Sequence, residues 1–384
     1  MAKKLGIIGG GQLGMMLTEA AKKMPLDISK IVVLDPTENC PAAKVGAEQI
    51  VADFKDESSI RELAERCDIL TYEIESGNSN VLKKLESKCE INPSPETLSI
   101  IQDKLTQKKF LSDNGIPVSR FSEVSSKIEL EAKVSEYGRP VLLKTRKDAY
   151  DGRGNFKINS AEQIPEALKN FDGKLLMVEQ FVDFKMEVSV IAARSTTGEI
   201  KTYPVVENIH EDNILKMTIA PARIDQEISA KAQKIAYKTM EVLKGAGVFG
   251  IEMFVTKDNN VLINEIAPRV HNSGHHTLQS SKVSQFEQHL RAILGMKLED
   301  TELLYTAIMY NILGPHGFTG EYNIPVINTE NSFLKMYGKL ESKPQRKIGH
   351  VNVIDKENLG VEELLKKVEI LKEGLVIQPK KTSE

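Results

Sequence analysis

The chain has 384 residues, more than one ordinary hydrophobic core serves, so we expect two or three domains. Hydrophobic residues make up 41% and charged residues 27% of the chain, as in a soluble globular protein, and a net charge of −3 excludes the broad basic field of a nucleic-acid-binding protein. No apolar stretch is long enough to cross a bilayer, and the N-terminus leads into a strand pattern instead of a signal peptide. We therefore expect a cytoplasmic protein with neither a nucleic-acid nor a membrane partner. Its three cysteines lack the spacing of a disulfide framework or zinc site and are expected to be core or incidental thiols.

Strands and helices alternate over the first hundred residues, which predicts a parallel sheet with helices on its faces. The expected strands are Leu5–Ile8, Ile31–Leu34 and Ile69–Tyr72, and the expected helices span residues 12–23 and 57–65. The proline-rich segment Asn92–Pro95 ends this α/β domain.

A mixed α+β segment follows. It is expected to contain a helix over residues 96–114, strands at Val141–Lys144, Leu175–Phe181 and Glu187–Ala193, a helix over 229–244, and a hairpin of Phe249–Val255 with Val261–Ile266. After about residue 296 we expect short strands, a Pro/Gly-rich loop at 314–325 and a last helix near 361–372.

The loop Gly9–Gly14 fits the G-x-G-x-x-G template between a strand and a helix, and Asp35 ends the next strand, where a ribose-binding acid would lie. Glycines let the backbone approach a phosphate, and the helix N-terminus offers free N–H groups. Two further interpretations stay open: a dinucleotide site of a nicotinamide dehydrogenase, and a tight turn that only packs strand against helix.

The hairpin brings two carboxylates together among apolar residues. If its turn is Asp258-Asn259, Glu252 lies directly opposite Glu265, and if it is Asn259-Asn260 the two are diagonal neighbours on one face. Like charges across a strand pair destabilise it, so something should neutralise them. Paired carboxylates favour Mg²⁺ with substrate phosphates, and the histidines after the hairpin lack zinc-site spacing.

A second glycine loop follows the strand that ends in Lys144. It is rich in cations and glycine and is suited to folding over a polyphosphate, although it is not a Walker A loop. The apolar segment at 177–182 could then hold a flat purine, and Glu187 the ribose hydroxyls. A mobile surface hairpin is the alternative for the loop.

The order of lysine strand, glycine flap, purine segment and acid pair resembles the ATP-grasp superfamily. Within it the chain is similar to the N5-carboxyaminoimidazole ribonucleotide synthetases over nearly its whole length. The motifs that carry the resemblance are GGGQLG (9–14), TYEIE (71–75), QDKLTQK (102–108), YDGRG (150–154), ENIH (207–210), IAPA (219–222), NEIAPRVHNSGH (264–275) and RKIGH (346–350).

The resemblance implies an N-terminal Rossmann-like domain (1–95), an ATP-grasp domain (96–295) with a flexible lid (about 115–182), and a small C-terminal domain (296–384) that completes the substrate site. It also implies a homodimer. The implied ATP-binding residues are Lys104, Lys144, Ala149, Tyr150, Asp151, Gly152, Arg153, Gly154, Asn155, Glu179, Gln180, Phe181, Val182, Glu187, His210, Asn264 and Glu265, with Glu252 and Glu265 as Mg²⁺ ligands.

The other implied roles concern the second substrates. Contacts to aminoimidazole ribonucleotide are expected from Gly11, Gln12, Leu13, Glu73, Tyr150, Lys339, Arg346 and Lys347, and catalytic roles from Lys144, Asp151, Arg269, His271 and Asn272. Three departures from the family pattern are Lys104 in place of arginine, Ala149 in place of glycine, and Ser76-Gly77 in place of asparagine.

The implied reaction is ATP-dependent carboxylation of 5-aminoimidazole ribonucleotide with bicarbonate, through carboxyphosphate, with Asp151 accepting the amine proton. The nearest alternative is another ATP-grasp ligase, such as the formate-dependent glycinamide ribonucleotide enzyme or a biotin carboxylase. A nucleotide sensor without activity on the same fold, and an NAD-dependent dehydrogenase, are more distant alternatives. The dehydrogenase would not account for the carboxylate hairpin or the second glycine loop.

Overall fold

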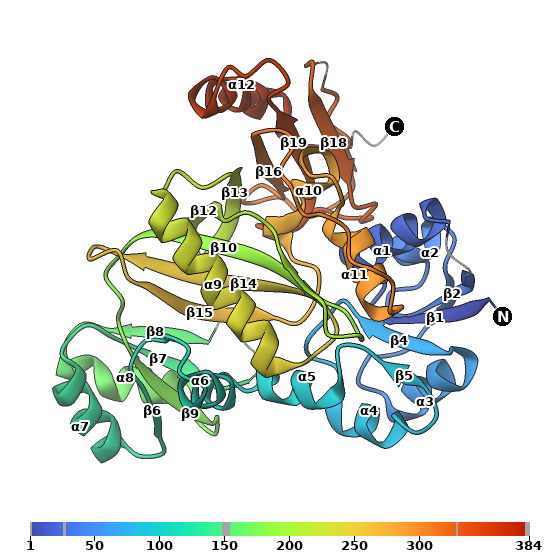
Figure 1. Cartoon of the computed structure of the whole chain (residues 1–384). Helices are drawn as coiled ribbons and strands as arrows, with labels where there is room; N and C mark the ends of the chain where they lie inside the picture. The colour runs from blue at the N-terminus through green and yellow to red at the C-terminus, as the bar shows by residue number, and fades with distance from the viewer. Residues whose placement is uncertain (1, 26–27, 148–153, 328, 381–384) are drawn as a thin grey trace.

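The computed structural model of the protein describes residues 2–25, 28–147, 154–327 and 329–380. Figure 1 shows the N-terminal sheet in blue and cyan, a smaller green sheet with α7 and α8, a large sheet crossed by the yellow helix α9, and the red C-terminal segment. Among the described residues, no helix is long and apolar enough to cross a membrane.

The N-terminal region contains the predicted parallel sheet, which in the described residues has the order β3-β2-β1-β4-β5. Its strands are β1 (Lys3–Ile8), β2 (Ile28–Leu34), β3 (Glu48–Ile50), β4 (Ile69–Tyr72) and β5 (Glu90–Ile91). The helices are α1 (Gln12–Lys23), α2 (Pro41–Lys44), α3 (Glu57–Arg66) and α4 (Ser79–Leu85). Apolar side chains line both faces of the sheet, because each face is covered by helices.

The single helix predicted over residues 96–114 is wrong, because the chain forms two helices there, α5 (Pro95–Gln102) and α6 (Lys104–Asp113). Asp103 separates them in an extended conformation, and its carboxylate accepts hydrogen bonds from the backbone N–H groups of Leu105 (3.0 Å) and Thr106 (3.2 Å). Arg146 also binds this carboxylate, with 2.7 Å between Nη2 and Oδ2. An N-cap fixed by an arginine from another segment therefore overrides the continuous helical pattern.

The predicted lid region, about 115–182, forms an antiparallel sheet with the order β6-β9-β7-β8 among the described residues. Its elements are β6 (Phe121–Val124), α7 (Lys127–Tyr137), β7 (Val141–Thr145), β8 (Asn155–Ile158), the 3-10 turn η1 (Ala161–Gln163), α8 (Ile164–Asn170) and β9 (Leu176–Gln180). It has a core of its own, built from apolar residues of the two helices and all four strands.

The large sheet is antiparallel and, in the described part of the chain, follows the order β15-β14-β10-β12-β13-β16-β19-β18, with β11 beside β10. Its first strands are β10 (Phe184–Arg194), β11 (Ile200–Thr202), β12 (Val206–Glu211), β13 (Ile214–Ala220), β14 (Gly247–Thr256) and β15 (Val261–Ala267). Helix α9 (Gln226–Leu243) packs on one face of this sheet, and its buried side chains join the same core as those of β10, β14 and β15.

The C-terminal segment adds strands to this same sheet, because β13 pairs with β16 across the boundary expected at residue 296. The segment contains β16 (Ala307–Leu313), β17 (Tyr322–Asn323), β18 (Ser332–Met336), β19 (Lys347–Ile354), α12 (Val361–Gly374) and β20 (Gln378–Pro379). The short elements η2 (Asn272–Gly274), α10 (Thr277–Ser280) and α11 (Gln285–Ile293) connect the two parts.

Helix α11 joins the central sheet to the N-terminal domain. Phe286 and Leu290 of α11 are fully buried in one core with Met16 and Leu17 of α1. His289 of α11 lies between the two sheets: its Nδ1 is 3.0 Å from the backbone nitrogen of Val248 and its Nε2 is 2.8 Å from Thr71 Oγ1. Because the Val248 N–H donates to Nδ1, the ring must be neutral, with its proton on Nε2. The three cysteines are free and buried, as expected from the sequence.

Because several histidines are buried, we expect the protein to lose stability in mild acid. Burial lowers the pKa of His276, His289 and His350 to about 3, so between pH 6.5 and 3 only the unfolded chain takes up these protons. Between pH 7.5 and 5.5 each such histidine should lower the free energy of unfolding by about 1.4 kcal/mol. His210 opposes this trend, because Glu187 raises its pKa against the effect of burial.

Urea unfolding of wild-type protein at pH 7.5 and 5.5 measures the loss. In His289→Gln the difference between the two pH values should shrink by about the contribution of one histidine, whereas it should persist in His316→Gln, whose side chain is exposed. Equal stability of the wild type at both pH values would contradict the prediction.

Candidate active site

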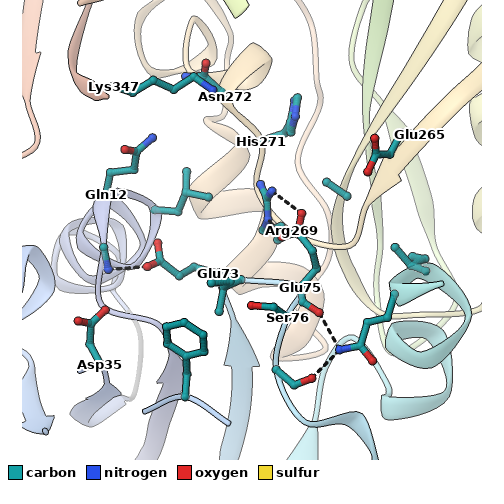
Figure 2. A pocket seen from close by; sticks show the side chains of 18 of the residues that line it. Gln12, Asp35, Glu73, Glu75, Ser76, Glu265, Arg269, His271, Asn272 and Lys347 are labelled. Carbon is teal, nitrogen blue, oxygen red and sulfur yellow. Dashed lines mark hydrogen bonds and ion pairs between the residues drawn. The ribbon is translucent and has the colours of Figure 1, made fainter. Parts of the chain in front are cut away.

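A cavity of about 1700 Å³ lies where the N-terminal domain, the central sheet and the C-terminal segment meet. This exceeds the ~300–1000 Å³ of a typical single-ligand pocket, so the cavity has room for two small molecules. Of the residues predicted from the sequence, those that line it are Gly11, Gln12, Leu13, Glu73, Lys104, Lys144, Asn155, Glu187, His210, Glu252, Asn264, Glu265, Arg269, His271, Asn272, Lys339, Arg346 and Lys347. Figure 2 shows Gln12 and Glu73 on one side of the pocket in this view, Glu265 on the other, and Arg269 between them.

Glu252 and Glu265 lie directly opposite each other on β14 and β15. Neither predicted turn is correct, since Thr256 and Asn260 pair around the three residues Lys257–Asn259. That register alone would place Asn264 opposite Glu252. A bulge shifts it, because Met253 pairs with Ile263 while Glu252 pairs with Glu265. Asn264 is the extra residue, and as a result Asn264 and Glu265 both line the cavity.

Each of these carboxylates has a cationic or titratable neighbour. Glu252 Oε1 is 3.2 Å from His271 Nε2, and Glu265 Oε2 is 3.0 Å from Lys104 Nζ. Burial raises the pKa of Glu252, but the hydrogen bond and charge of His271, helped by nearby cations, lower it to about 2. Burial lowers the pKa of Lys104, and Glu265 raises it above its ordinary value. Glu252 is therefore ionised at neutral pH.

Lys144 reaches the cavity from β7 of the lid sheet, where it is buried beside Glu179 of β9, with 3.1 Å between Nζ and Oε2. Glu179 itself is buried and does not line the cavity. Burial raises the pKa of Glu179, and the charges of Lys108 and Lys144 lower it to about 2.

The other members of the predicted purine segment also lie off the cavity surface. Gln180 donates to the backbone oxygen of Tyr137 at 3.3 Å, and the ring of Phe181 lies under Lys157. Val182 and Gly154 are half-buried and do not line the cavity either. The predicted flap residues Ala149, Tyr150, Asp151, Gly152 and Arg153 lie outside the described residues.

Glu187 and His210 form a contact at the cavity wall, between Oε2 and Nδ1, from neighbouring strands β10 and β12. Burial lowers the pKa of His210, and the hydrogen bond and charge of Glu187 raise it above its ordinary value. The two residues thus present a polar pair in close contact, near Glu252.

Arg269 binds Glu75 in a bidentate ion pair, with 2.5 Å from Nε to Oε2 and 2.9 Å from Nη2 to Oε1 (Figure 2). Burial lowers the pKa of Arg269, but Glu75 raises it above its ordinary value; burial raises the pKa of Glu75, and Arg269 lowers it. Glu75 follows β4 and Arg269 follows β15, so this ion pair joins the N-terminal domain to the central sheet. The sequence prediction missed Glu75, although it lies within the TYEIE motif.

The predicted free N–H groups of the glycine loop are already occupied. The Glu73 carboxylate accepts hydrogen bonds from the backbone N–H groups of Gly11 and Gly14, the latter at 2.6 Å, and Asp35 accepts from Gly10 at 2.9 Å. Figure 2 shows Glu73 and Asp35 on the same side of the pocket as Gln12. The prediction that this loop captures a phosphate through free N–H groups is therefore wrong for these positions. Carboxylates that follow β2 and β4, the two strands on either side of β1, take the place of the anion. Asp35 also accepts from the Thr37 N–H at 2.8 Å, and it lines the cavity.

The C-terminal segment supplies cations to the far side of the cavity. Lys339 Nζ is 3.0 Å from Gln12 Oε1 and 2.6 Å from the backbone oxygen of Lys347. Burial lowers the pKa of Lys339 to about 8, and Arg346 lowers it further than Glu73 raises it. Arg346, Lys347 and Lys339 therefore form a basic region that faces the N-terminal helix α1, and Asn272 lies nearby, hydrogen-bonded to Asn311 at 2.6 and 3.0 Å.

Several other lining residues were not predicted, including Glu75, Arg146, Lys147 and Asn213. Arg146 was overlooked although it follows the lysine strand directly, and its role as a partner of Asp103 depends on a contact 43 residues away in sequence. In the described residues no group of three or more His, Cys, Asp or Glu side chains could hold a metal ion. Any metal at Glu252 and Glu265 would need further ligands from substrate.

Comparison with known proteins agrees with this geometry. The model of the ATP-grasp domain matches residues 109–286, the ribonucleotide synthetase preATP-grasp domain matches residues 1–102, and the phosphoribosylaminoimidazole carboxylase C-terminal domain matches residues 307–364. The N5-carboxyaminoimidazole ribonucleotide synthase of Bacillus subtilis is 40% identical over 364 residues, covering 94% of each chain.

Solved structures give the same result. N5-carboxyaminoimidazole ribonucleotide synthetase from Thermotoga maritima is 44% identical with a TM-score of 0.88, covering 98% of this chain and 100% of that one. N5-carboxyaminoimidazole synthase from Aspergillus clavatus, in complex with ADP and 5-aminoimidazole ribonucleotide, is 35% identical with a TM-score of 0.88, covering 97% of this chain and 98% of that one.

The ion pair between Glu75 and Arg269 should contribute measurably to stability. Replacing Glu75 by Gln leaves a largely buried guanidinium without its counter-ion. We expect the free energy of unfolding to fall by about 1–2 kcal/mol, less than for a fully buried pair because the Glu75 side chain is 37% exposed. Urea unfolding measures the change. Glu57→Gln, which breaks the exposed pair with Arg61, is the matched control and should leave stability unchanged; equal effects of the two variants would contradict the prediction.

Proposed function

We infer, because the chain belongs to the N5-carboxyaminoimidazole ribonucleotide synthase family, that it is an ATP-dependent ligase that converts 5-aminoimidazole ribonucleotide to N5-carboxyaminoimidazole ribonucleotide in purine biosynthesis. The observation that carries this inference is one cavity that joins an acid pair, lysines from the lid side and a basic region from the C-terminal segment. Two phosphorylated molecules can share such a site, with the acid pair between them.

We propose that ATP binds on the lid side of the cavity. Lys104 and Lys144 would contact its phosphates, and Glu187 with His210 would contact the ribose, since these four side chains line one wall. The backbone of Glu179–Val182 would hold the adenine edge, and the flap from Ala149 to Asn155 would fold over the phosphates. The ammonium groups offset charge that develops on the transferring phosphoryl group.

Glu252 and Glu265 fit Mg²⁺, because both reach the cavity and directly opposed carboxylates supply the hard oxygen ligands that Mg²⁺ prefers. When bound, Mg²⁺ supplies positive charge against the nucleotide phosphates. Asn264 adds an amide oxygen beside Glu265 as a result of the bulge.

We propose that bicarbonate binds beside Arg269, His271 and Asn272, next to the acid pair. A bicarbonate oxygen attacks the γ-phosphorus of ATP, giving ADP and carboxyphosphate, which breaks down to CO₂ and phosphate. The exocyclic amine of aminoimidazole ribonucleotide then attacks CO₂ and loses a proton to Asp151. The closed cavity must exclude water, because both intermediates hydrolyse.

Aminoimidazole ribonucleotide would occupy the side of the cavity between α1 and the C-terminal segment. Lys339, Arg346 and Lys347 give that side the charge that a ribose phosphate requires, and Tyr150 would reach it from the flap. Because the glycine-loop N–H groups are occupied, Gly11, Gln12 and Leu13 would contact the substrate through side chains or packing, while Glu73 orders the loop. We further propose a homodimer in the cytoplasm, on the family resemblance.

The reaction predicts that nucleotide turnover depends on the acceptor. ADP release from protein with ATP, Mg²⁺ and bicarbonate should rise at least about tenfold when 5-aminoimidazole ribonucleotide is added, because the amine draws off CO₂ in the closed site. Labelled bicarbonate should enter an acid-labile product. Stimulation instead by glycinamide ribonucleotide with formate would keep the ATP-grasp mechanism and reject the substrate.

The proposed roles of Glu265 as a metal ligand and of Asp151 as a proton acceptor predict different kinetic defects. Glu265→Gln should lower kcat about 100-fold or more, since it removes a ligand that balances charge in phosphoryl transfer. Asp151→Asn should keep ATP binding and lose carboxylation. Steady-state kinetics with both substrates measure these effects, and Glu131→Gln, an exposed carboxylate of α7 in the lid region, serves as the control. Full carboxylation by Asp151→Asn would remove the proton-acceptor role and leave the metal role standing.

A further inference from the structure

Two of the lysines of helix α6, Lys104 and Lys108, lie one turn apart, and of these two only Lys104 reaches the cavity. Lys104 lines the cavity and binds Glu265, whereas Lys108 is 3% exposed and turned toward the lid sheet. Residues four apart lie on the same helical face, so both ammonium groups approach the nucleotide side of the site from one direction. The proposed reaction assigns no role to Lys108.

Lys108 ends in a buried cluster of three charges. Its Nζ is 3.1 Å from Ser119 Oγ and 3.5 Å from Glu179 Oε2, and Lys144 Nζ is 3.1 Å from the same carboxylate oxygen. The strand register explains the geometry: Glu179 pairs with Leu142, which places Glu179 and Lys144 diagonally on one face of the lid sheet. Ser119 also donates to Oε2, at 3.3 Å, so this oxygen has three polar neighbours.

The cluster has two positive charges and one negative charge, and all three residues are at most 7% exposed. Lys108 and Lys144 compete for one oxygen of Glu179, while Oε1 has no hydrogen-bond partner among the described residues. Without Lys108, Glu179 and Lys144 would form a neutral pair in a poorly solvated place. With Lys108 present, the cluster keeps one net positive charge, and of the two lysines only Lys144 borders the cavity.

We propose that Lys108 is a positioning residue that neutralises Glu179, so that the ammonium group of Lys144 keeps its charge available to the nucleotide phosphates. This inference rests on the proposed function, in which Lys144 contacts those phosphates. Lys108 touches no substrate in this account and acts only through the carboxylate that it shares with Lys144. The contact between Lys144 and the phosphates would therefore depend on a second lysine, Lys108, which does not itself touch the nucleotide.

The test is a cycle of variants read out by ADP binding in the presence of Mg²⁺. Calorimetric titration of wild type, Lys108→Met, Glu179→Gln and the double variant gives four dissociation constants. Lys108→Met should weaken ADP binding at least about tenfold in the wild-type background, because the Glu179 carboxylate then pairs with Lys144 alone and offsets its charge. In the Glu179→Gln background the same change should alter the dissociation constant less than about twofold, since no carboxylate remains to be neutralised.

A merely structural role for Lys108 gives another pattern. It would weaken binding equally in both backgrounds, or lower the thermal unfolding temperature without changing ADP affinity, and either result overturns the inference. Lys109→Met, on the same helix with an exposed side chain, is the matched control and should leave ADP affinity unchanged. Circular dichroism checks the fold of each variant. If Lys108→Met does not fold, the comparison of the double variant with Glu179→Gln decides: equal affinities support the proposal, and a further loss rejects it.

The readout also separates this inference from the proposed function. ADP binding needs no aminoimidazole ribonucleotide, so the predicted pattern together with no response of turnover to that substrate would support the role of Lys108 and reject the substrate assignment. Wild-type protein that binds no ADP would reject both.

Discussion

Two carboxylates face each other across adjacent strands at the wall of the cavity, and much of the surrounding structure compensates for that arrangement. Glu252 and Glu265 are brought into direct opposition by the bulge at Asn264. Directly opposed like charges destabilise a strand pair by roughly 0.2–1 kcal/mol, and more where solvent is excluded. His271 and Lys104 each bind one of the acids, so the pair persists although the hairpin alone would disfavour it.

The compensating groups come from separate segments, which makes the site a junction of the fold. Lys104 lies at the first position of α6 because Asp103 ends the preceding helix, and Arg146 of the lid region holds Asp103 in that position. Arg269 binds Glu75 of the N-terminal domain, and His289 joins Thr71 to Val248. Charge compensation and domain contact are therefore provided by the same residues, and loss of one weakens both.

The strand and helix pattern could be predicted from the sequence wherever local periodicity determines it. Helix α1 and strand β4 have the predicted ends, and the hairpin carboxylates were predicted as a pair. The bulge at Asn264 had a local signal, since the apolar residues Ile263 and Ile266 are three apart instead of two, but the partner of Glu265 also depends on the length of the hairpin turn, which the sequence left open. The break at Asp103 had a local signal, an N-cap residue, but the signal competes with a continuous helical pattern and is decided by Arg146, which is distant in sequence. The glycine loop shows the same limit: its sequence indicates exposed N–H groups, but not the Glu73 carboxylate that occupies them.

Charge is distributed unevenly around the acid pair. Buried histidines behind the site are neutral: His275 and His350 lie with ring centroids 4.8 Å apart, and burial holds the pKa of each below its ordinary value. The lysines at the lid and the basic residues of the C-terminal segment, in contrast, stay close to carboxylates or to the cavity surface. Positive charge is thus concentrated at the two ends of the cavity, while Arg269 between them is paired with Glu75. The cations would hold an anionic molecule at each end, and a divalent cation at the acid pair would offset the repulsion between carboxylates and phosphates, so that the reacting groups of two phosphorylated substrates could meet there.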